Sequence, residues 1–141
     1  MTCTFFGHRD APGSIESALK ETIEELIKRG VDKFYVGNNG NFDSMVRRVL
    51  KNIKGEHPQV YYAVVLSALP VSRVNEDTSD TVFPEGMEKT PPRFAITKRN
   101  KWMLEQSDIV VAYVRAVGGA EKFVNIAAKK GKEIINLAEL L

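Results

Sequence analysis

Two nearly unbroken apolar runs constrain the fold of this chain more than any other feature. They are Val60–Leu66 (VYYAVVL) and Asp108–Val114 (DIVVAYV). Apolar runs of this length, rich in β-branched residues, are typical of strands that are covered on both faces, as in parallel sheets. Such strands need helices on both sides of the sheet, so the sequence predicts an α/β fold.

The rest of the chain alternates between strand-like and helix-like segments. Three further runs have the composition of strands: Thr2–Phe6, Phe34–Val36 and Glu133–Leu137. Apolar residues recur at helical spacing within residues 14–30, 41–55, 91–107 and 119–131. This alternation predicts a single Rossmann-like, three-layer domain over residues 1–141, with a mainly parallel five-stranded sheet and helices on both faces. The proline-rich stretch Ser67–Pro92 is expected to be a loop with one short turn or helix.

Charge, cysteine content and hydropathy argue against several classes of protein. The net charge of +2 is too small for binding of nucleic acid or of a membrane surface by bulk electrostatics. Cys3 is the one cysteine, so we expect a buried thiol, with no intrachain disulfide and no metal cluster. No apolar run approaches the roughly 18 residues that span a bilayer, and the N-terminus lacks the pattern of a signal peptide. We therefore expect a cytoplasmic protein with no membrane partner, metal or cofactor.

Two glycine-rich turns each follow a strand and precede a helix. They are Gly37–Phe42 (GNNGNF) and Gly118–Ala120 (GGA). A glycine turn before a helix presents backbone N–H groups and the positive end of the helix dipole, which together can bind phosphate at the carboxyl edge of the sheet. The alternative is that each is an ordinary turn, because short glycine motifs match by chance. Asp43 either contacts a ribose hydroxyl or is a first-turn acid that the dipole favours.

Basic and acidic side chains lie near the same edge. His8 and Arg9 could bind a phosphate or move a proton; alternatively, His8 caps the strand end and Arg9 is solvated. Arg99 and Trp102 share one face of the third long helix and could hold a base or ribose phosphate, unless Trp102 packs in the core. Four carboxylates are candidates for a general base: Asp43, Glu85, Glu88 and Glu121. Spacing alone does not choose among them.

Six motifs together resemble one known family. They are TFFGHRD (Thr4–Asp10), GNNGNFD (Gly37–Asp43), PEGME (Pro84–Glu88), PPRFAITKRNKWM (Pro91–Met103), SDIVVAYV (Ser107–Val114) and GGA (Gly118–Ala120). Their content and order are similar to the YpsA-like family of the SLOG superfamily of Rossmann-like domains. That superfamily also contains the DNA-processing protein DprA and the LOG phosphoribohydrolases. The resemblance implies a nucleotide or nucleotide-sugar ligand.

The resemblance also raises an enzymatic alternative. The LOG enzymes cleave the N-glycosidic bond between an adenine-type base and ribose 5′-monophosphate. Their catalytic arginine begins an Arg-Lys-x-x-Met motif that matches Arg99 to Met103, with Asn100 in place of the lysine. Their catalytic glutamate falls on Asn125, which cannot act as a carboxylate base. The carboxylates that could replace it are Glu121, Glu85 and Asp43.

Taken together, these features predict a domain that binds a mononucleotide, ADP-ribose or a cyclic nucleotide, as a sensor or a sequestering module. The alternative is a nucleotide N-glycosidase that releases a base from a nucleoside phosphate. The residues expected to bind the ligand are Gly7, His8, Arg9, Gly37, Asn38, Asn39, Gly40, Phe42, Asp43, Arg93, Asn100, Gly118, Gly119 and Ala120. The residues expected to be catalytic are Arg99, Glu121 and Glu85. A homodimer is expected by analogy, and nucleic acid is not an expected partner.

Overall fold

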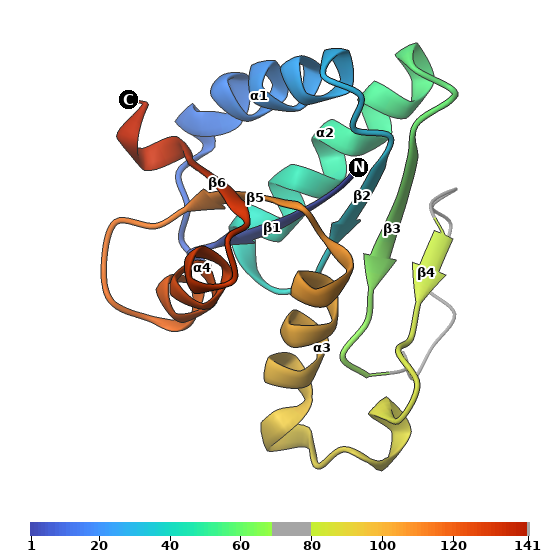
Figure 1. The fold of residues 1–141 in the computed structure, drawn as a ribbon, viewed down its shortest axis with the longest axis vertical. Coiled ribbons are helices and arrows are strands. Elements are labelled where there is room, and N and C mark those ends of the chain that lie inside the picture. The colour runs from blue at the N-terminus through green and yellow to red at the C-terminus, as the bar shows by residue number, and fades with distance from the viewer. Residues whose placement is uncertain (69–79, 141) are drawn as a thin grey trace.

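The computed structural model describes residues 1–68 and 80–140, and its strands and helices alternate along the chain (Figure 1). They are β1 (Thr2–Gly7), α1 (Glu16–Lys28), β2 (Lys33–Val36), α2 (Gly40–Glu56), β3 (Tyr61–Val65), β4 (Asp80–Val82), α3 (Pro92–Gln106), β5 (Ile109–Tyr113), α4 (Gly119–Lys129) and β6 (Glu133–Asn136). Short 3-10 helices lie at Gly13–Ile15, Met87–Lys89 and Leu137–Glu139. Among these residues no helix combines the length and the hydropathy needed to cross a membrane.

The strands form one parallel sheet in the order β4-β3-β2-β1-β5-β6. β2, β3 and β4 lie in sequence order on one side of β1. The chain then crosses back, so that β5 lies beside β1 on its other side and β6 lies beyond β5. The order therefore reverses between β1 and β5, at whose carboxyl ends ligands bind in open α/β sheets. The predicted α/β class and parallel sheet are confirmed.

The sheet has a sixth strand that the sequence does not predict. The backbone of β4 pairs with β3, with Asp80 opposite Ala63 and Val82 opposite Val65. Its residues are largely exposed and lack the alternation of apolar and polar side chains that marks a strand. Pairing with β3, and not local sequence, therefore makes this segment a strand.

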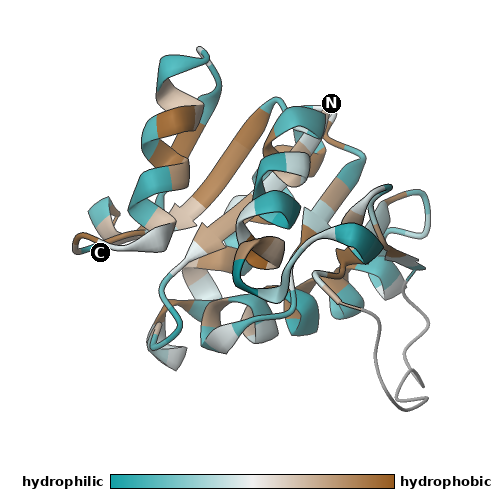
Figure 2. Ribbon diagram, turned by 90° about the horizontal axis from the view of Figure 1, so that it is seen from below, coloured by the Kyte–Doolittle hydropathy of each residue, from teal (hydrophilic) through white to brown (hydrophobic). Residues whose placement is uncertain are grey.

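Two apolar layers separate the sheet from its helices. One layer contains Phe5 and packs against α1 and α2; the other contains Phe6 and packs against α3 and α4. Consecutive residues enter opposite layers because side chains alternate along a strand. Figure 1 shows the two helix pairs on opposite sides of the sheet, and Figure 2 shows apolar strands enclosed by helices with hydrophilic outer faces. Cys3 is fully buried, as predicted.

Helix α3 carries a mixed polar and apolar face toward the carboxyl edge of β1. It begins at Pro92, where a proline loses no helical hydrogen bond. From there Ile96, Arg99, Asn100 and Met103 recur at spacings of three and four residues, so they lie on one side of the helix. This side of α3 forms part of the site described next.

Candidate functional site

A pocket of about 290 Å³ opens where the strand order reverses. It is enclosed by the end of β1 and the residues that follow it, by the starts of α2 and α4, and by one side of α3. Its lining residues are Phe5, Phe6, Gly7, His8, Arg9, Asn39, Asp43, Ile96, Arg99, Asn100, Met103, Gly119 and Ala120. Small-molecule sites have volumes of roughly 300–1,000 Å³, so this pocket suits a small ligand.

Arg99 provides a buried cation in the pocket wall. The residue is only 2% exposed. Its Nη1 donates hydrogen bonds to Oδ1 of Asn38 and of Asn39, both at 2.9 Å, and its Nε donates to Oδ1 of Asn100 at 3.0 Å. Its Nη2 makes no hydrogen bond to any residue that the structure describes. The guanidinium is therefore held through Nε and Nη1, and the two N–H groups of Nη2 are left without a partner among the described residues.

The two glycines of the turn that leads into α2 have different structural roles: Gly37 makes room for Arg99, and Gly40 turns the chain. A Cβ on Gly37 would lie 2.9 Å from Cζ of Arg99 and 2.8 Å from Oδ2 of Asp43, which is too close for nonbonded atoms. Gly40 has a φ of +86°, a left-handed conformation that residues with a Cβ rarely adopt. The GNNG motif therefore has a structural role in holding an arginine and turning the chain.

Asp43 is the one acidic residue among those that line the pocket. It lies in the first turn of α2, is 8% exposed, and its Oδ2 accepts the Asn39 N–H at 3.0 Å. Burial raises the pKa of this carboxyl, and the Asn39 N–H and then the Arg99 charge oppose the rise. Burial also lowers the pKa of Arg99, and Asp43 opposes that change. The two buried charges therefore stabilise each other.

The two helix N-termini at the pocket differ in their free backbone donors. At α2, the N–H of Asn41 donates to the carbonyl oxygen of Arg9 at 2.8 Å, and the N–H of Asn39 donates to Asp43. At α4, the N–H groups of residues 119–121 have no acceptor among the described residues, and no side chain caps the helix. The N-terminus of α4 is therefore the more open of the two to an anion.

His8 connects the pocket wall to the loop between β5 and α4. Its Nε2 accepts the backbone N–H of Arg115 at 2.8 Å and that of Ala116 at 3.3 Å. The imidazole meets the ring of Tyr113 edge-on, with the ring centroids 6.1 Å apart. The side chain thus holds the backbone that leads into α4.

The structure brings most of the residues expected to bind a ligand to this one edge. Those that line the pocket are Gly7, His8, Arg9, Asn39, Asp43, Asn100, Gly119 and Ala120. Asn38 and Gly37 do not line it: Asn38 accepts a hydrogen bond from Arg99, and Gly37 lies against the Arg99 guanidinium. Gly40 and Gly118 belong to the flanking turns, and Phe42 is fully buried in the core.

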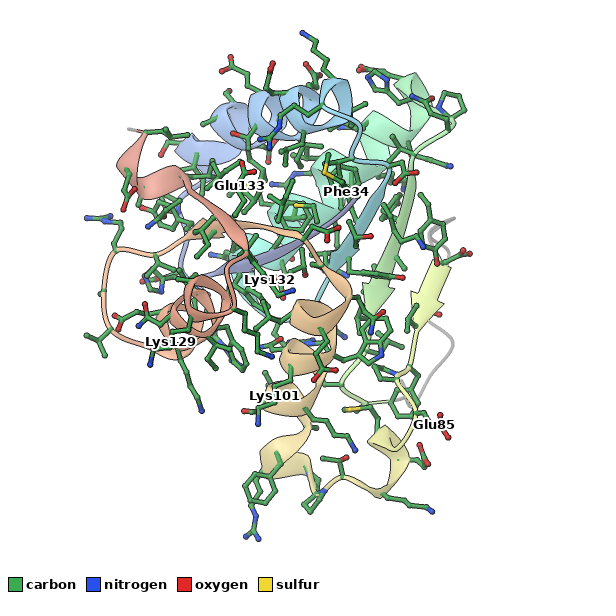
Figure 3. The ribbon with its side chains drawn as sticks, in the orientation of Figure 1. Phe34, Glu85, Lys101, Lys129, Lys132 and Glu133 are labelled. Carbon is green, nitrogen blue, oxygen red and sulfur yellow. The ribbon has the colours of Figure 1, made fainter. Side chains whose placement is uncertain are left out.

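Three further expected site residues also lie outside the pocket lining. Glu85 is exposed on the segment between β4 and α3, where Figure 3 shows its side chain directed outward. Arg93 is exposed at the start of α3, with its Cζ 4.8 Å from the centroid of the Phe94 ring. Glu121 accepts a hydrogen bond from Asn125 Nδ2 at 3.4 Å.

Trp102 has the packing role that the sequence left open as an alternative. Its ring meets that of Tyr35 edge-on, with the centroids 5.1 Å apart, and it does not line the pocket.

Sequence reasoning missed the apolar wall formed by Phe5, Ile96 and Met103. For Ile96 and Met103 the signal was present, since they share a side of α3 with Arg99. Residues 1–68 and 80–140 contain no group of His, Cys, Asp or Glu side chains that could hold a metal ion.

The six-stranded parallel sheet with a pocket at its carboxyl edge defines a Rossmann-like α/β domain. The sequence matches no family model and no curated protein. Among solved structures, the fold is similar to that of DNA processing protein A from Helicobacter pylori, which is described for its single-stranded DNA binding mode, with a TM-score of 0.61 and 14% identity. The match covers 95% of this chain and 63% of that one. At this identity the likeness establishes a shared fold, and DprA belongs to the superfamily of the YpsA-like family that the motifs resemble.

Proposed function

We propose that the protein binds a small, phosphate-bearing ligand derived from a nucleotide, as a sensor or a sequestering module. One observation carries the proposal: free donors from two elements meet at one pocket. Arg99, whose Nη2 has no hydrogen-bond partner among the described residues, lines the pocket together with Gly119 and Ala120, whose N–H groups at the start of α4 have no acceptor there. A guanidinium edge and a helix N-terminus both bind phosphate oxygens well, so the combination favours an oxyanion.

The rest of the pocket fits a sugar and part of a base. Asp43 and Asn39 offer acceptors and donors for ribose hydroxyls, while Ile96 and Met103 supply an apolar wall. The volume of about 290 Å³ supports a mononucleotide or sugar phosphate over a dinucleotide. Within the group of expected ligands, a mononucleotide or cyclic mononucleotide is therefore favoured over ADP-ribose.

Calorimetric titration tests this proposal. We expect AMP, cyclic AMP and ribose 5-phosphate to bind, and adenosine, which lacks the phosphate, to bind much more weakly. Ala120→Asp places a carboxylate at the mouth of the open helix N-terminus and should weaken AMP binding at least tenfold by like-charge repulsion. The protein should still fold, because an acidic residue in the first helical turn is favourable.

The matched control is Ala128→Asp, the same change at an exposed position of α4 outside the pocket lining. It should leave the affinity for AMP close to that of the unmodified protein. Absence of binding by every phosphate-bearing compound at millimolar concentration would refute the proposal. So would equal affinities of the Ala120→Asp and Ala128→Asp variants for AMP.

A second candidate function is an N-glycosidase acting on nucleoside monophosphates, and the position of Asp43 favours it. A carboxylate in the pocket beside Arg99 could accept a proton from water as the water oxygen attacks C1′ of the ribose. The bond from C1′ to the base nitrogen breaks, and the base leaves with the electron pair and takes up a proton. The products are ribose 5-phosphate and the free base.

Incubation with AMP followed by chromatography distinguishes turnover from binding. If the protein is an enzyme, we expect free adenine from the unmodified chain and a loss of at least a hundredfold in rate for Asp43→Asn, within the usual range for general acid–base catalysis of about 10²–10⁴. Glu121→Gln and Glu85→Gln are matched controls and should retain activity, because neither residue lines the pocket. No release of adenine by the unmodified chain would leave binding alone.

A further inference from the structure

The loop between β5 and α4 leads into the open helix N-terminus, and side chains from two other elements hold it. Asn136 binds the backbone of Val114 on both sides: Oδ1 accepts its N–H at 3.1 Å and Nδ2 donates to its carbonyl oxygen at 3.0 Å. His8 Nε2 then binds the next two N–H groups, those of Arg115 and Ala116. Val117 beyond them is 90% exposed. Among the described residues, His8 is therefore the last side-chain tether before α4 begins.

We propose that His8 is a positioning residue whose neutral imidazole holds residues 115 and 116, and through them the N-terminus of α4, and whose protonation releases them. Only one part of this inference rests on the proposed function, namely the expected change in the affinity for an anion. The state of the loop itself is a separate, directly measurable property.

The hydrogen bonds require the neutral form of the ring. An Nε2 that accepts two N–H groups must present its lone pair, so the ring proton is on Nδ1. Protonation puts a hydrogen on Nε2, which then points at the N–H groups of Arg115 and Ala116, and both bonds are lost. Histidine changes charge between about pH 5 and 8. The bond from the His8 backbone N–H to the carbonyl oxygen of Tyr113, at 3.2 Å, does not titrate. The strands therefore stay paired while the loop is released.

The charged and titratable groups around the ring make the direction of the effect testable. Tyr113 on β5 and Arg115 on the loop contact the ring, Arg9 and Asp10 follow it in the chain, and Asp43 on α2 and Arg99 on α3 line the same pocket; Glu121 lies in the first turn of α4, outside the lining. A protonated His8 would add a positive charge to a wall that already contains Arg9 and Arg99, and this alone would strengthen anion binding. Release of the loop has the opposite effect on affinity. The two roles therefore predict opposite pH dependence.

The experiment measures backbone amide hydrogen exchange of the ligand-free full chain, together with the affinity for inorganic sulfate, over about pH 5 to 8. Sulfate keeps its charge over this range. As the pH falls, protection of residues 115 and 116, corrected for the intrinsic exchange rate, should drop roughly tenfold or more, because two hydrogen bonds are lost. The affinity for sulfate should fall with it.

Three variants separate the tether from other causes. His8→Gln keeps an acceptor oxygen but does not titrate, so protection should be retained and its pH dependence lost; any titration of Asp43 remains and can be subtracted. His8→Ala removes the acceptor, and protection should be low at every pH. His57→Gln changes the other histidine, at the end of α2 outside the pocket lining, and should behave like the unmodified protein.

Two results would overturn the proposal. One is the same pH-dependent loss of protection in His8→Gln as in the unmodified chain. The other is a sulfate affinity that rises as the pH falls while protection stays constant, since His8 would then act directly on the anion. If protection changes as expected but sulfate binds at no pH, the tether is supported and the proposed anion-binding function fails.

Discussion

Arg99→Ala is expected to lower the free energy of unfolding by about 3–5 kcal/mol, the usual cost of removing one member of a buried charge pair. The change leaves Oδ1 of Asn38 and Asn39 without the donor they share. It also leaves Asp43 buried without the charge that opposes its raised pKa most strongly. Because the Nη2 donors that we propose bind the phosphate are lost as well, we expect no measurable AMP binding. Urea denaturation followed by Trp102 fluorescence and calorimetric titration measure the two effects.

The pH dependence of this variant has a defined sign. Without Arg99 the pKa of Asp43 rises further, and the folded state then disfavours the ionised carboxylate relative to the unfolded chain. The destabilisation is therefore complete above the folded-state pKa of Asp43 and is partly recovered as the pH falls through it. Adding Asp43→Asn to Arg99→Ala should recover part of the lost stability at neutral pH.

Arg93→Ala is the control for Arg99→Ala, because it removes the same residue type from an exposed position on the same helix. A surface change of this kind typically alters the free energy of unfolding by no more than about 0.5 kcal/mol. AMP binding should persist. Equal stability and equal AMP affinity of the two variants would contradict the assignment of Arg99 as the buried cation of the site.

Gly37→Ala is expected to destabilise the protein by about 1–3 kcal/mol, the usual cost of overpacking a filled interior. The new methyl group would lie 2.9 Å from Cζ of Arg99 and 2.8 Å from Oδ2 of Asp43, and both side chains are buried. Relief requires the guanidinium to move away from the turn, so its hydrogen bonds with Asn38 and Asn39 weaken. We therefore expect weaker AMP binding in addition to the loss of stability, measured by the same titration and urea denaturation.

Gly55→Ala, a change of the same type within α2, is expected to raise the stability of the protein. Gly55 lies in the last turn of α2, and a Cβ there would meet no atom within 4 Å. Removing a glycine from a helix should stabilise the protein by about 0.5–1 kcal/mol, with AMP affinity unchanged. A loss of stability in Gly37→Ala no greater than in Gly55→Ala would show that the close approach at Gly37 is unimportant.

The sequence was sufficient wherever the structure follows from a local, periodic pattern. Val60–Leu66 and Asp108–Val114 identify interior strands because a strand covered on both faces must be apolar at nearly every position. Helical spacing predicts α1 to α4, and Pro92 marks the beginning of α3. The parallel sheet and the position of a site at its carboxyl edge then follow from general rules of α/β folds.

Local patterns failed where the outcome depends on a partner that is distant in the chain. β4 has no strand signal of its own and forms by pairing with β3. Arginine is a residue type that usually lies on the surface. Arg99 is nevertheless buried, because Asn38 and Asn39, some 60 positions earlier, accept its hydrogen bonds. Glu85 and Glu121 were candidate catalytic groups because both were expected near the carboxyl edge of the sheet, and the fold leaves both outside the pocket lining.

By itself the amino-acid sequence determined the alternation of five of the six strands with the four helices, the parallel sheet and the two glycine turns, because hydrophobic periodicity and turn chemistry act over a few residues. Only the tertiary structure decided which turn is open. The carbonyl oxygen of Arg9 and the carboxylate of Asp43 occupy donors before α2, whereas the N–H groups at the start of α4 remain free. Hydrogen bonds between segments far apart in the chain leave no periodic trace in the sequence, so the nature of the pocket became visible only in the folded chain.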